Sequence, residues 1–135
     1  MGTKVAGQRY ARMGNPPNAR ILVVEDEPLV RAYVADVLRD EGYEAVEAEN
    51  ADTALELLKS DRFNLIVTDI EMPGSLNGIE LAWASEAQNP QLPVVVMSGR
   101  MLPRRSDLPT GTRFVAKPCA PETLLLVNTD VLGQT

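Results

Sequence analysis

The sequence predicts an α/β fold in which a five-stranded parallel sheet is covered by helices on both faces. Short apolar segments alternate along the chain with segments of helical periodicity. The central apolar segments, such as ILVV at 21–24 and VVV at 94–96, lack the polar alternation of a half-exposed strand. Uninterrupted apolar strands are typical of parallel sheets buried on both faces. The 135 residues suit a single domain with one continuous interior.

Five strands alternate with four helices in this prediction. The strands are expected at residues 21–24, 43–49, 65–68, 93–98 and 113–116. The helices are expected over about residues 28–41, after residue 50, over about 78–88, and from residue 121 onward.

Local signals place the elements of the first half. Pro28 suits the first turn of the first helix, and Gly42 suits its end. The alternating segment YEAVEAE predicts the second strand, and Asn50 can cap the helix that follows it.

The second half contains a buried strand, LIVT at 65–68, which a turn at Pro73-Gly74 follows. After the fourth strand, Pro103 and Pro109 forbid a continuous helix, so we expect at most one helical turn around residues 104–108.

Composition narrows the classes of function. Residues 1–19 read as a flexible tail and residues 20–135 as the domain. The first 20 residues carry four basic side chains and no acid, so the rest has 13 − 4 = 9 basic against 19 acidic residues, a net charge of −10. This body should repel nucleic acid. A lone cysteine, Cys119, and no apolar run long enough to span a membrane lead us to expect a cytoplasmic protein without disulfides.

Histidine is absent, which excludes histidine-ligated zinc and Ser-His-Asp hydrolysis. Chemistry must therefore use carboxylates, hydroxyls and lysine. Such groups follow four of the predicted strands: Glu25, Asp26, Asp69, Ser98 and Lys117. Each alone suits a cap, a turn or a surface position. Right-handed crossovers bring the carboxyl ends of parallel strands to one edge, so we expect these groups to converge there.

The converging groups point to phosphoryl transfer. Three neighbouring carboxylates repel one another unless a cation lies between them, and an all-oxygen site suits Mg²⁺. Beside a carboxylate nucleophile, a metal ion and a lysine neutralise phosphoryl oxygens while a hydroxyl donates to one of them.

Four motifs also resemble the receiver domain of two-component response regulators: ILVVEDEPLVR, VTDIEMPG, VVVMSG and FVAKP, in this order over about residues 20–130. The resemblance implies a flavodoxin-like fold and a phosphorelay signalling protein rather than an enzyme with turnover. It implies that Asp69 accepts a phosphoryl group from a phosphohistidine of a sensor histidine kinase or phosphotransfer protein. The only reactions expected are self-catalysed phosphotransfer and dephosphorylation.

The resemblance further assigns roles to individual residues. Mg²⁺ binding is implied for Glu25, Asp26, Asp69 and the backbone carbonyl of Glu71. Lys117 is implied to pair with Asp69 or its phosphate, Ser98 to contact the phosphate, and Phe114 to change rotamer with Ser98. The Lys117-Pro118 bond is implied to be cis.

The sequence also departs from typical receivers. The fourth helix is shortened or absent, which puts the usual output and dimer face in doubt, although a homodimer is expected as one possible form. The MPGSLNG loop is one residue longer than usual. The side chains of Glu71 and Arg100 either flank the phosphate and modulate its lifetime or are solvated loop residues.

Two other functions stay open at this point. A haloacid-dehalogenase-type phosphatase also uses an aspartate and Mg²⁺, and Glu71 stands where its acid/base would, but the chain leaves no room for a cap domain. A degenerate receiver would serve as a phosphate-independent binding module.

Overall fold

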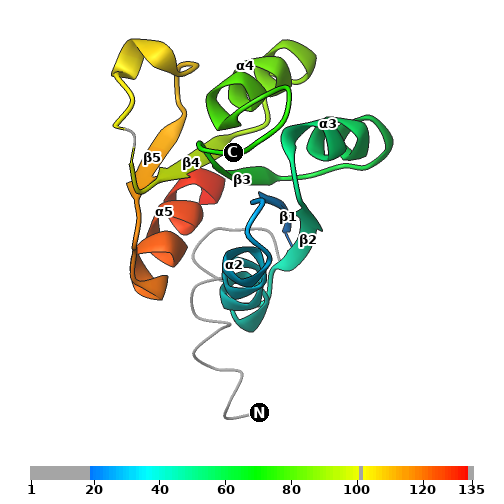
Figure 1. Ribbon diagram of the computed structural model, residues 1–135. Helices are drawn as coiled ribbons and strands as arrows, with labels where there is room; N and C mark the ends of the chain where they lie inside the picture. Colours follow the sequence, from blue (N-terminus) through cyan, green and yellow to red (C-terminus); the bar gives the residue numbers. More distant parts are fainter. Residues whose placement is uncertain (1–18, 101, 134–135) are drawn as a thin grey trace.

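The structure is a computed structural model that describes residues 19–100 and 102–133, and it has the predicted α/β architecture (Figure 1). The strands are β1 (Arg20–Val24), β2 (Glu44–Ala48), β3 (Leu65–Asp69), β4 (Val94–Ser98) and β5 (Arg113–Ala116). The helices are α2 (Pro28–Asp40), α3 (Ala51–Ser60), α4 (Gly78–Gln88) and α5 (Pro121–Gly133), with a 3₁₀ turn η1 (Arg105–Asp107). Of the expected tail, residues 1–18 lie outside the described residues, and Ala19 is buried.

The five strands are parallel and lie in the order β2-β1-β3-β4-β5. Helices α2 and α5 cover one face of the sheet, and α3 and α4 cover the other (Figure 1). Each helix pair closes its own apolar cluster against the sheet. From β1 the chain first adds β2 on one side and then β3, β4 and β5 on the other, so the strand order reverses between β1 and β3. Open α/β sheets form a crevice at the carboxyl ends of the strands at such a point.

The local signals in the first half act as predicted. Pro28 occupies the first turn of α2, and Gly42 ends the helix with a φ of 95°, a conformation that favours glycine. The Asn50 side chain accepts a hydrogen bond of 2.7 Å from the Thr53 amide and so caps α3. Within the described part of the chain, no helix is long and apolar enough to cross a membrane.

The segment between β4 and β5 confirms the expected loss of a full helix, because η1 is a single turn between Pro103 and Pro109. The indole N–H of Trp83 on α4 donates to the Asp107 carbonyl at 2.8 Å, although the Trp83 side chain is 48% exposed. Leu108 is buried in the cluster under α3 and α4. The turn is therefore attached to α4 by one aliphatic anchor and one hydrogen bond.

The first turn of α4 lies directly against the end of β3. The Gly78 amide donates to the Ile70 carbonyl at 3.0 Å, and Asn77 and Glu80 form a capping box at the helix start. A Cβ atom on Gly78 would lie 2.0 Å from the Asp69 carbonyl oxygen. The absence of a side chain at Gly78 is therefore what allows α4 to begin where it does.

We predict that Gly78→Ala lowers the free energy of unfolding by about 3 kcal/mol, because backbone at the end of β3 must move to admit the methyl group. Urea denaturation followed by circular dichroism measures this loss. Gly99→Ala is the control, since its Cβ would meet the Lys117 Cβ at an ordinary 3.5 Å. Equal losses in the two variants would contradict the close approach of α4.

Candidate functional site

The backbone brings the strand ends together at one edge of the sheet. Asp69 is the last residue of β3 and pairs in register with Met97 on β4. Ser98 follows Met97, and its carbonyl accepts a hydrogen bond of 2.9 Å from the Lys117 amide beyond β5. The Glu25 amide continues the β1–β2 ladder by donating to Ala48 at 3.1 Å. The expected convergence of these residues is therefore a consequence of strand register.

Three carboxylates form an acidic cluster at this edge, namely Glu25, Asp26 and Asp69. One oxygen from each lies within 4.8 Å of the other two. Glu25 and Asp69 are buried, with exposures of 2% and 4%, whereas Asp26 is exposed. Two of the three negative charges are thus removed from water, which is costly unless they are compensated.

The Lys117 ammonium lies between the two buried carboxylates. Its Nζ donates to Glu25 Oε1 at 2.9 Å and lies 3.1 Å from Asp69 Oδ1. The contact between Lys117 and Asp69 is an ion pair that lacks hydrogen-bond geometry. Asp69 Oδ1 is buried and accepts no hydrogen bond. A lone ammonium therefore pairs with both buried acids but can neutralise only one of their two negative charges.

Burial dominates the electrostatics of the site. It raises the pKa of Glu25 and of Asp69 above their ordinary values, although Lys117 opposes both shifts. The negative charge of Asp69 raises the pKa of Glu25 further, and the negative charge of Glu71 raises the pKa of Asp69 further. Burial alone would lower the pKa of Lys117, but its interactions with the carboxylates of Glu25 and Asp69 outweigh this effect and raise the pKa.

The donor set fits a hard divalent cation. All three side chains of the acidic cluster offer a carboxylate oxygen. Carboxylate oxygens with room for water are the ligands that Mg²⁺ prefers. A cation there would also offset the repulsion that raises the pKa values of the buried acids.

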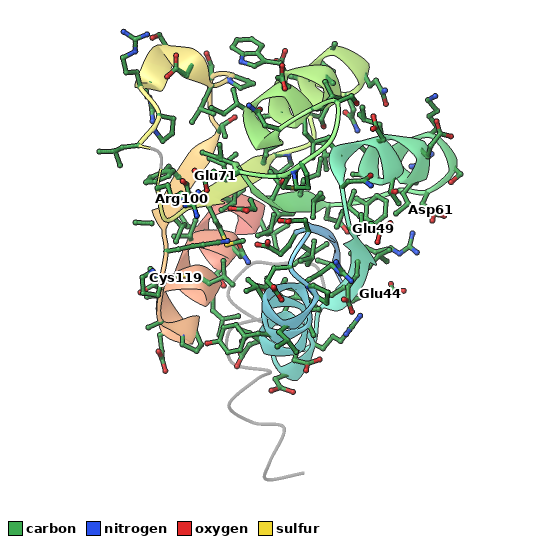
Figure 2. All side chains as sticks on the ribbon, in the orientation of Figure 1. Glu44, Glu49, Asp61, Glu71, Arg100 and Cys119 are labelled. Atoms are coloured by element: carbon green, nitrogen blue, oxygen red, sulfur yellow. The ribbon has the colours of Figure 1, made fainter. Side chains whose placement is uncertain are left out.

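Ser98 is engaged on the outer side of the site. Its hydroxyl donates to Glu71 Oε2 on the loop after β3 and accepts a hydrogen bond of 3.2 Å from the Arg100 amide. Figure 2 shows Glu71 and Arg100 side by side at this edge. The Ser98 side chain is thus held by groups other than the three clustered carboxylates.

Phe114 stands two residues before Ala116, the register partner of Ser98. Alternate residues of a strand share one face, so Phe114 and Ser98 face the same side of the sheet. Phe114 is partly buried there, packed on the cluster under α3 and α4. The Lys117-Pro118 bond is cis. All the residues selected from the sequence therefore lie around the one edge.

Besides the pairing of Ser98 with Glu71, two further contacts were not predicted from the sequence. The Arg31 guanidinium on α2 donates to the Glu25 backbone carbonyl at 2.8 Å. The Ser75 hydroxyl, in the loop between β3 and α4, lies 2.9 Å from Asp52 on α3. The contact of Arg31 could have been predicted from its position one turn into a helix that begins beside Glu25 and Asp26. No feature of the sequence predicts the contact of Ser75.

Comparison with known proteins gives one consistent family. Residues 21–127 match the response regulator receiver domain. The nitrogen assimilation regulatory protein NtrX of Azorhizobium caulinodans is 46% identical over 80 residues, which are 58% of this chain and 18% of NtrX. The chain therefore spans less than a fifth of that relative's length.

Solved structures agree with this match. The receiver domain of the hybrid histidine kinase CckA is 33% identical with a TM-score of 0.73, covering 84% of this chain and 99% of that one. The response regulator TrrA of Thermotoga maritima, solved in complex with Mg²⁺-BeF, is 33% identical with a TM-score of 0.76 and the same two coverages.

We predict that Lys117→Met lowers the free energy of unfolding at pH 7 by about 3 kcal/mol, because it leaves two buried carboxylates without a cation. Their already raised pKa values should rise further. The folded state then binds protons at a higher pH than the unfolded state, so the deficit should shrink as the pH falls toward 5. Urea denaturation at the two pH values measures it.

The matched control for this prediction is Lys59→Met, which removes an exposed lysine paired with Glu56. Its effect should be near zero at both pH values. A Lys117→Met deficit that stayed the same or grew at pH 5 would show that the lysine does not compensate the two acids.

Proposed function

The chain belongs to the response regulator receiver family, and on this premise we propose that Asp69 accepts a phosphoryl group from a phosphohistidine of a partner kinase. Receiver domains are signal-transduction modules that interact with sensor histidine kinases. The observation that carries the proposal is the buried Asp69 carboxylate at the end of β3, whose Oδ1 lies 3.1 Å from the Lys117 ammonium. A carboxylate so placed is oriented by Lys117 at the edge where the acidic cluster lies.

In the transfer, an Asp69 oxygen forms a bond to phosphorus while the phosphorus–nitrogen bond of the donor breaks. The electron pair of that bond stays on the imidazole of the donor. Lys117 then exchanges its pairing with the Asp69 carboxylate for one with a phosphoryl oxygen, which requires a shift of only the flexible lysine end. Dephosphorylation is the attack of water on the same phosphorus, which returns the Asp69 carboxylate.

We propose that Mg²⁺ binds to Glu25, Asp26 and Asp69, with the backbone carbonyl of Glu71 as a further ligand. The metal ion would supply charge neutralisation for the phosphoryl oxygens. The capture of TrrA with Mg²⁺-BeF supports this proposal for a related domain. Asp26, the exposed member, is the side chain able to reach a hydrated ion from the solvent side.

The output of the domain is a change of conformation. An acyl phosphate adds about −1.5 to −2 charges at neutral pH. Ser98 would leave Glu71 to donate to a phosphoryl oxygen, and Phe114, on the same face, would fill the space that this movement opens. The signal then passes by protein contact to a target or to a second copy of the chain.

The two alternatives have less support. In a haloacid-dehalogenase-type phosphatase Glu71 would serve as acid/base, whereas here its carboxylate accepts the Ser98 hydroxyl. A phosphate-independent module has no need of a lysine shared by two buried acids. The intact cluster therefore favours a working phosphoacceptor.

The first test is intact-protein mass spectrometry after incubation with Mg²⁺ and acetyl phosphate. We expect one phosphoryl adduct that is labile at alkaline pH and absent from Asp69→Ala. Chelation of Mg²⁺ should abolish it. An adduct that persists in Asp69→Ala would place the phosphoryl group elsewhere. If acetyl phosphate gives none, a phosphohistidine donor is the second reagent, and failure with both would leave the binding-module alternative.

A second test concerns the charge of Glu71 at the mouth of the site. Glu71→Gln keeps an acceptor for Ser98 but removes a negative charge that opposes anionic donors. We expect acetyl phosphate to modify this variant roughly twofold to fivefold faster than wild type. Glu86→Gln, on the exposed surface of α4, makes the same change in net charge and should leave the rate unchanged. Equal rates for both variants would make Glu71 a bystander.

A further inference from the structure

Arg31 on α2 connects the acidic cluster to the neighbouring strand. Its Nη1 donates to the backbone carbonyl of Glu25 at 2.8 Å, and its Nε donates to Glu47 Oε1 on β2 at 3.3 Å. The side chain is 18% exposed, so the guanidinium is largely removed from water. Arginine suits this position because its planar fork binds two acceptors in fixed directions.

The carbonyl that Arg31 binds lies between two of the clustered acids. The peptide group that begins at the Glu25 carbonyl ends at the Asp26 amide, and this group is planar. A hydrogen bond to that carbonyl therefore fixes the direction in which the backbone enters Asp26. It also fixes the orientation of this plane relative to the Glu25 side chain.

The other polar groups of Glu25 are already engaged. Its amide donates to Ala48 at 3.1 Å, Oε1 accepts from Lys117 at 2.9 Å, and Oε2 accepts from the Glu27 amide at 3.2 Å. The Arg31 bond to the carbonyl completes this set. Without it, the turn between β1 and α2 could rotate about the Glu25 peptide while β1 stayed in place.

We propose that Arg31 is a positioning residue that holds Glu25 and Asp26 in the arrangement that binds the divalent cation. The inference rests on the proposed Mg²⁺ site and concerns a residue that touches none of its ligand oxygens. Arg31 acts through the Glu25 carbonyl, with Glu47 as its anchor on β2.

Arg39 provides a matched control on the same helix. Its Nη2 donates to the Ala45 carbonyl at 2.8 Å and to Glu47 Oε2 at 3.3 Å. It thus makes the same kind of bridge to the same glutamate. Ala45 lies three residues before Ala48 on β2, away from the acidic cluster. Loss of Arg39 removes an equivalent bridge between α2 and β2 without touching the turn at Glu25.

The experiment compares Arg31→Met and Arg39→Met by calorimetric titration with MgCl₂, together with their thermal unfolding. Both variants should unfold at similarly lowered temperatures. Only Arg31→Met should bind Mg²⁺ more weakly, by roughly tenfold, as is typical when a residue that orients metal ligands is removed. Arg31→Lys, which keeps one donor, should recover part of the affinity and serves if Arg31→Met does not fold. Equal Mg²⁺ affinity of Arg31→Met and Arg39→Met would overturn the proposal.

A second readout does not need the metal. Hydrogen exchange of the Glu27 amide, which donates to Glu25 Oε2, should be faster in Arg31→Met than in Arg39→Met without Mg²⁺. If wild type binds no Mg²⁺, the proposed metal site fails, and faster exchange of this amide would still support the positioning role. Unchanged exchange in that case would overturn the positioning role as well.

Discussion

The structure depends on a lysine that compensates two buried acids from different strands. Glu25 follows β1, Asp69 ends β3, and Lys117 follows β5, so this charge compensation exists only when β1, β3, β4 and β5 are in register. Taking two carboxylates out of water costs several kcal/mol, and a single ammonium offsets only part of that. The pKa values of both acids are raised because the part of this burial cost that the ammonium does not offset disfavours their charged forms. The site therefore keeps excess negative charge, which a bound divalent cation would offset.

The loops around this edge differ in how firmly they are held. The turn after β1 is fixed by two hydrogen bonds to Glu25: Arg31 donates to its backbone carbonyl, and the Glu27 amide donates to its side chain. The start of α4 is fixed by the contact of Gly78 with the backbone of β3. The Ser98 hydroxyl instead donates to the end of a flexible side chain, Glu71, and accepts a hydrogen bond from the Arg100 amide. The residues proposed to bind the metal are thus held through backbone groups, while Ser98, proposed to respond to phosphate, is held by a side chain and one loop amide.

The sequence alone predicts most of this arrangement, for identifiable reasons. Buried parallel strands leave apolar runs, and Pro28, Gly42 and Asn50 mark helix ends through backbone chemistry that acts locally. The convergence of the site follows from topology, because parallel strands cannot place their carboxyl ends anywhere but at one edge. The pairing of Ser98 with Glu71 and the bridge of Arg31 to Glu25 could not be predicted in this way. Both depend on side-chain rotamers and on loop paths, which strand register does not determine.

The lost helix changes where a movement of Ser98 is transmitted. The Ser98 hydroxyl donates a hydrogen bond to Glu71 and accepts one from the Arg100 amide, so a movement of Ser98 would break both bonds. Arg100 begins the segment that leads to η1, and this segment is attached to α4 through the Trp83–Asp107 hydrogen bond and the buried Leu108. In a full helix, such a movement would be shared by several turns of packed side chains. Here the movement would act on a loop between Pro103 and Pro109 that contacts α4 through the Trp83–Asp107 hydrogen bond. Within the described structure, we therefore expect phosphorylation of Asp69 to change the surface around Arg100, η1 and Trp83 most.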